Sequence, residues 1–465
     1  LFTKGLYVAM ASRILLWSLI LIALIKLAKT LNVGFRYFLF AVFMFVFVDQ
    51  SISSGEWIFG GAEQKVWAYF FFFLSLSELL NKRYFRAGLN SGLAISSHVI
   101  VGGYSLVAIG VAMVFCLKKN YMGKLFKFFG PVILFGAPIL FFALQYLGNG
   151  SSVHGNLDGG LGATAINVFF RNPHHLDPNA FDRIGILLLL AMGFFTLMAI
   201  LKGKPWQPYR KELAIVFIVP WFFFAIGILA RIVGAIWVLK FYPFRFADTL
   251  TSLLFWILVP SFVLNEAPNY FRKRLPDPYF FNRCCLAAMS VIIFRGTLAI
   301  AVPCMVSRIH ASVQEWSQFL NEPTEHKRYV EAVTWIKSNT ARSDVILVNP
   351  MWGDFWLDAE RPMVVSFKLS PANGRAVEWY YRLRRLNGGK DFKGKSFGIK
   401  KELNINFNRL TIEQITSLCE DYGAEYYFVN EQRPDLEKFS KFSNEGYFIY
   451  FIGCKNRRSI PKPSG

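Results

Sequence analysis

The chain has 465 residues, of which 54% are hydrophobic and 17% aromatic, and its net charge is +21. A soluble globular protein carries roughly 25% charged residues, whereas this chain carries 17%, so the composition excludes an ordinary soluble protein and indicates a polytopic membrane protein. The Lys and Arg residues gather in short loops beside apolar segments. This placement favours charge that orients the chain in a membrane, and it argues against nucleic-acid binding.

Nine apolar segments approach the length that crosses a bilayer. They fall at about residues 8–28, 35–49, 66–80, 91–117, 126–147, 184–202, 212–231, 246–265 and 284–306. Five of the loops beside them are basic, and the positive-inside rule predicts that these loops are cytoplasmic.

The segment 91–117 has basic residues at both ends, which does not fit a single crossing. Two short helices that meet at Gly102-Gly103, as a re-entrant segment or tight hairpin, would resolve the conflict. Loops 50–65, 148–183 and 232–245 then face outward, together with the N-terminus and everything after about residue 306. We therefore expect a polytopic α-helical membrane protein with about 9–10 transmembrane helices.

The tail differs in composition and alternates strand and helix patterns. This alternation predicts a small extracytoplasmic α/β domain at 320–465 with a mostly parallel sheet, after a transmembrane domain at 1–310. Strands are expected at 344–349, 362–367, 426–430 and 447–452, and a helix opened by a Thr411 cap is expected to Tyr422. The six cysteines have neither CxxC nor metal-ligand spacing, so they indicate neither a disulfide scaffold nor a zinc site.

Four groups of polar residues lie in or beside the predicted outward loops. Glu63 and Lys65 stand at the outer mouth of a helix. They are either an interfacial pair within an aromatic belt, or a carboxylate that orients a polar substrate and a cation that meets a phosphate. His98 interrupts an apolar run, and is either a neutral histidine bonded to a helix carbonyl or a cavity-facing group.

The loop 148–183 contains Arg171, the adjacent His174 and His175, and Asp177 between prolines. Adjacent histidines rarely point at one metal, and no Cys or Glu ligand stands at a suitable spacing, so no metal site is predicted. Arg171 with the two histidines suits an anion such as phosphate, and Asp177 could fix an imidazole tautomer or act as a base. The alternative is a loop fastened by its own hydrogen bonds.

Arg245 and Asp248 open the eighth segment just after Pro243. Their i, i+3 spacing puts both on one helix face, so they can neutralise each other. An arginine at an outward helix start also suits a lipid-linked phosphate.

Four stretches resemble the GT-C superfamily of polytopic glycosyltransferases, and more specifically a set of bacterial membrane proteins that end in a domain of unknown function. They are Glu63-Gln-Lys-Val-Trp-Ala-Tyr, Ser91-Gly-Leu-Ala-Ile-Ser-Ser-His98, Arg171-Asn-Pro-His-His-Leu-Asp-Pro, and the tail from Trp335 to Glu378-Trp-Tyr-Tyr-Arg382. In GT-C enzymes the catalytic acid lies in the first outward loop, after the first transmembrane helix. This chain enters the membrane as the second GT-C helix would, so that helix and loop are expected to be absent from the sequence.

The resemblance implies a glycosyltransferase that takes a sugar from a polyprenyl-phosphate-linked donor at the outer face of the plasma (inner) membrane. Arg171, His174, His175 and Arg245 would neutralise the phosphate, with Lys65, His98 and Asp248 as further substrate-binding residues. Glu63 or Asp177 would orient or deprotonate the acceptor. The alternative is a non-catalytic GT-C-like subunit or lipid-binding component of a larger membrane assembly. The expected partners are membrane lipids, a polyprenyl-phosphate lipid and protein subunits.

Overall fold

The computed structural model describes residues 2–47, 50–116, 121–149, 162–265, 324–371 and 373–453. These residues form two compact units. The membrane unit takes the described residues up to Asn149 and those from His174 to the end of the helix at Asn265. The second unit takes residues 162–173 and the described residues from 324 on. Each unit is described by itself.

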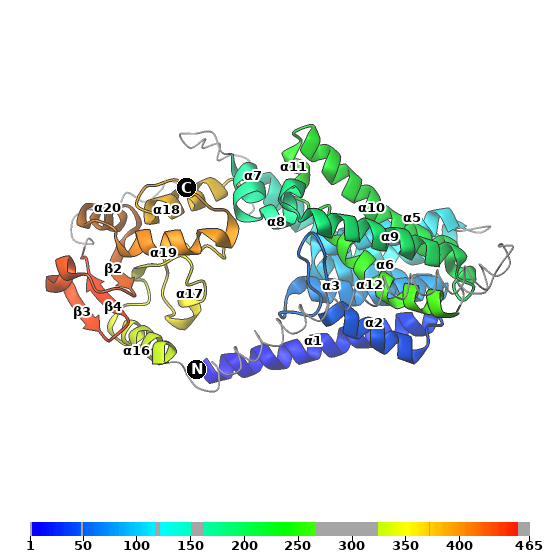
Figure 1. Cartoon of the computed structure of the whole chain (residues 1–465), viewed down its shortest axis with the longest axis horizontal. Helices are drawn as coiled ribbons and strands as arrows, with labels where there is room; N and C mark the ends of the chain where they lie inside the picture. Colours follow the sequence, from blue (N-terminus) through cyan, green and yellow to red (C-terminus); the bar gives the residue numbers. More distant parts are fainter. Residues whose placement is uncertain are drawn as a thin grey trace, which may run out of the picture. The chain divides into compact units, whose positions relative to one another are not determined.

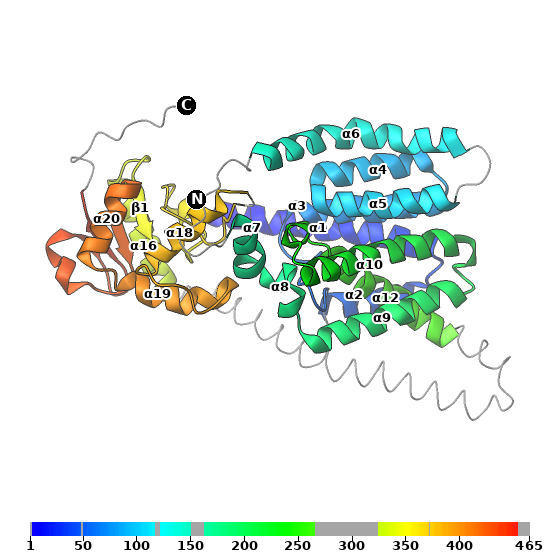
Figure 2. The same cartoon turned by 90° about the horizontal axis from the view of Figure 1, so that it is seen from above.

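The membrane unit is a bundle of long helices that run back and forth between its two ends, as Figure 2 shows for α4, α5, α6, α9 and α10. Its helices are α1 (Phe2–Thr30), α2 (Phe35–Phe47), α3 (Gln64–Leu80), α4 (Tyr84–Ser97), α5 (Val99–Cys116), α6 (Tyr121–Asn149), α9 (Arg183–Lys202), α10 (Arg210–Ile232) and α12 (Arg245–Asn265). Short elements join them, namely α8 (Pro173–Leu176, whose first residue falls in the second unit), η2 (Pro178–Ala180), η3 (Gln207–Tyr209) and α11 (Ile236–Leu239).

Six helices among the described residues are long and apolar enough to cross a membrane. They are α1, α5, α6, α9, α10 and α12. Two further predicted segments, 35–49 and 66–80, form the shorter helices α2 and α3, and the first part of the segment 91–117 lies in α4; these helices have 13, 17 and 14 residues. At a rise of 1.5 Å per residue these span about 20–26 Å, less than a ~30 Å hydrocarbon core. The predicted segment 284–306 lies outside the described residues.

The run 91–117 does form two helices, but they meet at His98 and not at the glycines as predicted. The backbone of His98 is extended, with φ −158° and ψ 110°, and the amide of Val101 donates to its Nδ1 at 3.2 Å. The imidazole thus caps the first turn of α5. Gly102 has another role, because a Cβ there would lie 2.4 Å from the Cα of Ile95, and its absence lets α4 and α5 pack closely.

Three stretches of the predicted outward loops are described in the membrane unit, at residues 50–65, 174–183 and 232–245, and they lie at one end of it, which we call the pocket end. There Arg231 donates to Asp177, and the Tyr104 hydroxyl donates to the carbonyl of Phe241. The described residues of four basic loops lie at the opposite end, where Lys26 pairs with Glu78, the Trp206 indole donates to the carbonyl of Leu31, and Lys124 lies over the ring of Tyr84. The fifth basic loop lies outside the described residues. The charge pattern in the sequence therefore corresponds to a real division between the ends of the bundle.

Helix α12 is the central helix of the bundle, and 89% of its membrane-length window is buried. Its neighbours include α2, α9 and α10. Phe246, in its first turn, stacks against Tyr69 of α3 at 6.1 Å between ring centroids. This packing fixes the start of α12, which carries Arg245 and Asp248.

The second unit is built around a four-stranded sheet of order β1-β2-β4-β3, of which Figure 1 labels β2, β4 and β3. The strands are β1 (Val345–Val348), β2 (Ala424–Val429), β3 (Ser440–Ser443) and β4 (Phe448–Phe451). Only β1 and β2 are parallel, whereas β4 runs antiparallel to both β2 and β3. The prediction of a mostly parallel sheet was therefore wrong. The expected strand at 362–367 is reduced to one bridge between Met363 and Ile346.

Helices and short elements flank this sheet, and they carry apolar residues into two cores. They are α7 (Ala163–Ala165), η1 (Ile166–Arg171), α16 (Thr324–Asn339), α17 (Phe355–Asp358), α18 (Ala376–Leu386), η5 (Ser396–Ile399), α19 (Lys400–Asn408), α20 (Ile412–Tyr422) and η6 (Pro434–Phe439). The first two come from the loop 148–183, and Ile166 and Phe170 are buried in the core of this unit.

Helix α20 begins as the sequence predicted. The Thr411 hydroxyl accepts from the amide of Gln414, and the Gln414 side chain accepts in return from the amide of Thr411. The helix ends at Gly423, whose φ of 66° is the left-handed conformation that glycine adopts at low cost. Cys419 in its last turn is disulfide-bonded, which the cysteine spacing did not predict.

Candidate functional site

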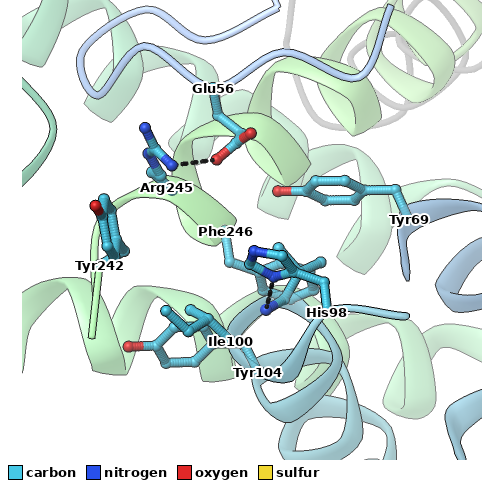
Figure 3. A pocket seen from close by; sticks show the side chains of 9 residues that line it. Glu56, Tyr69, His98, Ile100, Tyr104, Tyr242, Arg245 and Phe246 are labelled. Carbon is cyan, nitrogen blue, oxygen red and sulfur yellow. Dashed lines mark hydrogen bonds and ion pairs between the residues drawn. The ribbon is translucent and has the colours of Figure 1, made fainter. Parts of the chain in front are cut away.

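A cavity of about 130 Å³ opens at the pocket end of the membrane unit (Figure 3). Charged, hydroxyl and imidazole groups share its wall with apolar side chains. The wall is formed by Glu56, Tyr69, His98, Ile100, Val101, Tyr104, Tyr242, Arg245 and Phe246. They come from the loop before α3, from α3 itself, from the turn between α4 and α5, from α5, and from the start of α12 with the segment just before it. Small, partly polar cavities of this kind suit a small ligand group.

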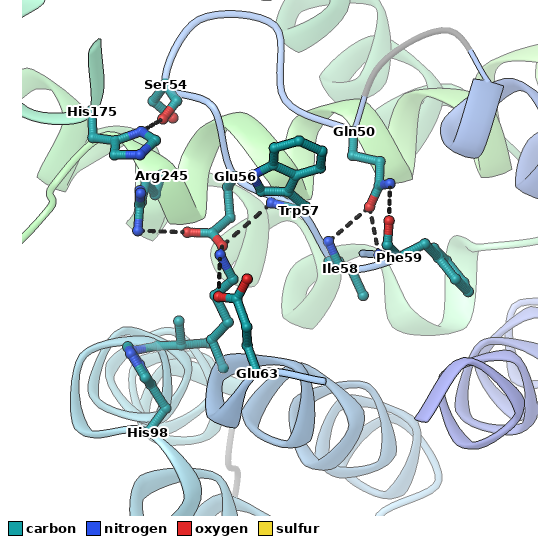
Figure 4. Close-up of polar contacts among 12 residues, drawn as sticks. Gln50, Ser54, Glu56, Trp57, Ile58, Phe59, Glu63, His98, His175 and Arg245 are labelled. Carbon is teal, nitrogen blue, oxygen red and sulfur yellow. Dashed lines mark hydrogen bonds and ion pairs between the residues drawn. The ribbon is translucent and has the colours of Figure 1, made fainter. Parts of the chain in front are cut away.

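Glu56 is the buried carboxylate of this wall, with 3% of its surface exposed. Lys65 contacts one carboxylate oxygen at 2.7 Å, and Arg245 contacts the other at 3.2 Å (Figure 4). A buried carboxylate is costly unless it is paired and hydrogen-bonded, and the two cations provide that pairing. The sequence reasoning missed Glu56. Its only signal there was a lone acid in an outward loop among apolar residues, seven positions before the more conspicuous Glu63.

The guanidinium of Arg245 has three different kinds of surroundings. Its guanidinium contacts Glu56, and it lies over the ring of Tyr242 at 4.5 Å from the centroid. Its Nε is buried and has no hydrogen-bond partner in the structure. A buried donor without a partner costs free energy, so this atom suits a ligand oxygen. The predicted self-neutralising pair with Asp248 is not what the structure shows, because Arg245 pairs with Glu56.

Asp248 lies one turn further along α12, is fully buried and does not line the cavity. Its two oxygens accept hydrogen bonds from the loop residues 51–54. These hydrogen bonds attach the loop that precedes α3 to α12.

Glu63 and Lys65 are adjacent in space, at 3.0 Å, but their surroundings differ. The Glu63 side chain is 55% exposed and that of Lys65 only 10%. Lys65 therefore bridges an exposed carboxylate and the buried carboxylate of Glu56. Neither Glu63 nor Lys65 lines the cavity.

His98 lines the cavity. Because the Val101 amide donates to Nδ1, the neutral ring carries its proton on Nε2 and can act as a donor there. The turn between α4 and α5 thus places a neutral imidazole opposite the Glu56 carboxylate (Figure 3).

The two histidines of the Pro-His-His motif stack on one another, with ring centroids 3.8 Å apart. His175 Nδ1 lies 2.6 Å from the carbonyl oxygen of Ser54, so this nitrogen carries the proton and donates it. Burial, together with the positive charge of Arg245, lowers the pKa of His175 to about 2. His175 is thus a neutral group that fastens the loop before α3.

Asp177 is also held by protein groups. Its carboxylate accepts from Arg231 at 2.9 Å and from the amide of Asn179 at 3.1 Å. It caps the short helix η2 in this way, and it does not line the cavity.

Arg171 belongs to the second unit, unlike the two histidines that follow it. Its guanidinium lies over the rings of Phe367 and Phe397, at 4.6 and 5.3 Å from their centroids. Its Nε donates to the carbonyl of Phe367 at 3.2 Å. Arg171 fastens η1 onto this unit, so the structure does not gather it into one unit with His174, His175 and Arg245.

Among the described residues, no group of three or more His, Cys, Asp and Glu side chains could hold a metal ion. The site consists of ion pairs beside a cavity.

A family model described as "Domain of unknown function (DUF6798)" matches residues 327–386. The match covers most of α16 and all of β1, α17 and α18 in the second unit. A search of curated proteins finds no match to the chain. The family match therefore covers one part of the second unit. It does not extend to the residues that line the cavity of the membrane unit.

Proposed function

We propose that the membrane unit binds the phosphate of a polyprenyl-phosphate-linked sugar and transfers the sugar to an acceptor, as GT-C glycosyltransferases do. The observation that carries this proposal is the cavity in which Arg245, with an unpartnered Nε, lies beside Glu56 and His98. Arginine is suited to phosphate because it offers several donors in a fixed geometry. The Nε2–H of His98 is a second, neutral donor at the same cavity.

In the proposed reaction, the hydroxyl oxygen of the acceptor forms a bond to the anomeric carbon while the bond from that carbon to the phosphate oxygen breaks. The lipid phosphate leaves with the electron pair, and Arg245 stabilises its charge. The acceptor's proton passes to a carboxylate. We assign this role to Glu56, because it is the carboxylate in the cavity wall, whereas Glu63 and Asp177 lie outside that wall.

The side of the membrane follows from charge. The described basic loops lie at the end opposite the cavity, and we assign that end to the cytoplasm because the positive-inside rule favours it. The cavity then opens at the outer face of the plasma membrane. The disulfide of Cys419 supports an extracytoplasmic second unit, since disulfides persist in oxidising compartments.

A non-catalytic lipid-binding component of a larger assembly is the second candidate. It is favoured by the ion pairs at both oxygens of Glu56, which occupy the carboxylate that would take the proton.

The test uses the full chain in lipid nanodiscs and compares polyprenyl phosphate with the corresponding polyprenol by native mass spectrometry. We expect the phosphate to be retained and the alcohol to be lost, and retention to fall in Arg245→Met. Equal retention of both lipids would contradict the proposal. Incubation with radiolabelled polyprenyl-phosphate sugars then separates the two candidates, because only the enzyme releases the sugar from its phosphate.

A further inference from the structure

The loop that carries Glu56 is held by two buried side chains, Asp248 of α12 and Gln50 near the start of the loop. Asp248 of α12 is 0% exposed, and one of its oxygens, Oδ2, accepts from the amides of Ser53 and Ser54 at 2.8 and 2.7 Å. The same oxygen accepts from the hydroxyl of Ser51 at 2.7 Å, and Oδ1 accepts from the amide of Ile52 at 2.9 Å. The hydroxyls of Ser53 and Ser54 are also within 3.0 Å of Oδ2.

These contacts explain how a charge can sit at this depth. An isolated buried carboxylate is strongly unfavourable, but one surrounded by amide and hydroxyl donors is stabilised by charge-assisted hydrogen bonds. The donors come from four consecutive residues, Ser51 to Ser54. The amides of residues 52–54 are among these donors, so the hydrogen bonds to Asp248 also fix three backbone positions of that loop.

The other side of Glu56 is fixed in the same manner. The Gln50 side chain accepts from the amides of Ile58 and Phe59 at 2.7 and 2.6 Å, and it donates to the carbonyl of Phe59 at 2.7 Å (Figure 4). Asp248 and Gln50 thus hold the loop on both sides of Glu56.

Between these two fastenings, Gly55 has a φ of +65°, and a Cβ there would lie 3.0 Å from the ring of His175. The left-handed backbone and the close ring both require glycine. This turn directs the next residue, Glu56, towards Lys65 and Arg245.

We infer that Asp248 is a positioning residue for Glu56: by binding residues 51–54 it sets where the Glu56 carboxylate stands against Arg245 and the cavity. Preorganised charges of this kind act without reorganisation when the ligand arrives. The inference rests on the proposed phosphate site for its functional meaning. Its structural content, a loop ordered by Asp248, stands independently.

The variant Asp248→Asn keeps the size of the side chain but replaces one acceptor oxygen by an NH2 group, which opposes the amides of residues 52–54. We expect the amide hydrogen exchange of residues 51–58 to rise about tenfold or more, and polyprenyl-phosphate binding to weaken by about tenfold. Ser54→Ala, which removes one hydroxyl donor and leaves the backbone bonds, is the milder variant and is expected to shift both readouts in the same direction by less. Unchanged exchange in folded Asp248→Asn protein would overturn the inference.

A double-mutant cycle separates positioning from general stability. If Asp248 acts through Glu56, the effect of Asp248→Asn on polyprenyl-phosphate binding disappears in a Glu56→Gln background. Additive losses would show that Asp248 only stabilises the fold, and would overturn the inference. If the wild-type protein binds no polyprenyl phosphate, the proposed function fails, and the exchange experiment alone still decides whether Asp248 orders the loop.

Discussion

The two ends of the membrane unit each contain one buried carboxylate flanked by two cations, yet they differ in where those cations lie. At the pocket end the side chains of Lys65 and Arg245 are 10% and 19% exposed. At the opposite end the partners of Glu78 are Lys26 and Arg83, and their side chains are 39% and 55% exposed.

This difference separates an ion cluster that fastens helices from one that can hold a ligand. At the opposite end, exposed cations remain solvated, and the Thr30 hydroxyl bonds the Ser77 hydroxyl beside the ion pair. At the pocket end, the charges are withdrawn from water, and Glu56 and Arg245 line a cavity. Burying a cation costs free energy, and the packing of helices does not require it. A ligand-binding function therefore best explains the buried cations at the pocket end.

The largest effect is expected from removing either buried carboxylate. Glu56→Gln leaves Arg245 without its charge partner and Lys65 with only the exposed Glu63, and should lower the free energy of unfolding by about 3–5 kcal/mol. Chemical denaturation of the detergent-solubilised protein measures this loss.

Glu78→Gln is the matched variant at the opposite end. It should destabilise the protein less, because its cations can turn to water, and it should leave polyprenyl-phosphate binding intact. If Glu78→Gln lost polyprenyl-phosphate binding and Glu56→Gln kept it, the ligand site would lie at the opposite end and not at the pocket end.

Replacing the cation at the cavity comes next. Arg245→Met should weaken polyprenyl-phosphate binding by a factor of about 10 to 100, since a charge-assisted hydrogen bond contributes roughly 1.5–3 kcal/mol. Arg245→Lys keeps the charge but lacks Nε, and an intermediate affinity is expected. Arg83→Met provides the control at the other end, and titration in nanodiscs should show no change for it.

The pH dependence of stability offers a third test. His175 has a pKa of about 2 in the folded protein and about 6.5 when unfolded, so between these values the unfolded chain binds the extra proton. Stability therefore falls as the pH falls, and from pH 7 to pH 5 His175 should contribute a loss of about 2 kcal/mol.

The variant His175→Asn isolates this contribution, because its amide can donate to Ser54 but does not titrate. The wild-type protein should lose more stability than this variant over the same pH range. Parallel losses would mean that His175 is not held neutral.

The smallest effect is expected from Lys26→Met. Half-exposed ion pairs contribute about 1 kcal/mol or less, so the unfolding midpoint should change little and binding should not change. A loss of unfolding free energy as large as that of Glu56→Gln would contradict the proposed difference between the two ends.

Much of the fold followed from patterns that are local in sequence. Apolar length predicted the helices, charge placement predicted which loops share an end, and the Thr411 cap predicted the start of α20. The break at His98 and the antiparallel β4 depend on packing with distant segments, and neither follows from residue periodicity. The short strand β3 was also missed.

The site was only partly visible in the sequence. His98 was selected because ionisable groups in apolar runs need a partner or cavity, and Arg245 because an arginine at an outward helix start suits a lipid-linked phosphate. Glu56 was missed because its importance comes from Lys65 and Arg245, and Arg245 lies 189 positions away. Arg171 was grouped with its neighbours His174 and His175, but proximity in sequence did not put their side chains in one unit.

The most direct test of the central claim is photocrosslinking with a polyprenyl phosphate that carries a diazirine beside the phosphate, followed by mass-spectrometric mapping. The proposed site predicts crosslinks in the cavity wall, at residues 98–104 and 242–246, that unlabelled polyprenyl phosphate removes by competition. Crosslinks confined to other surfaces, or crosslinks that competition leaves unchanged, would contradict it.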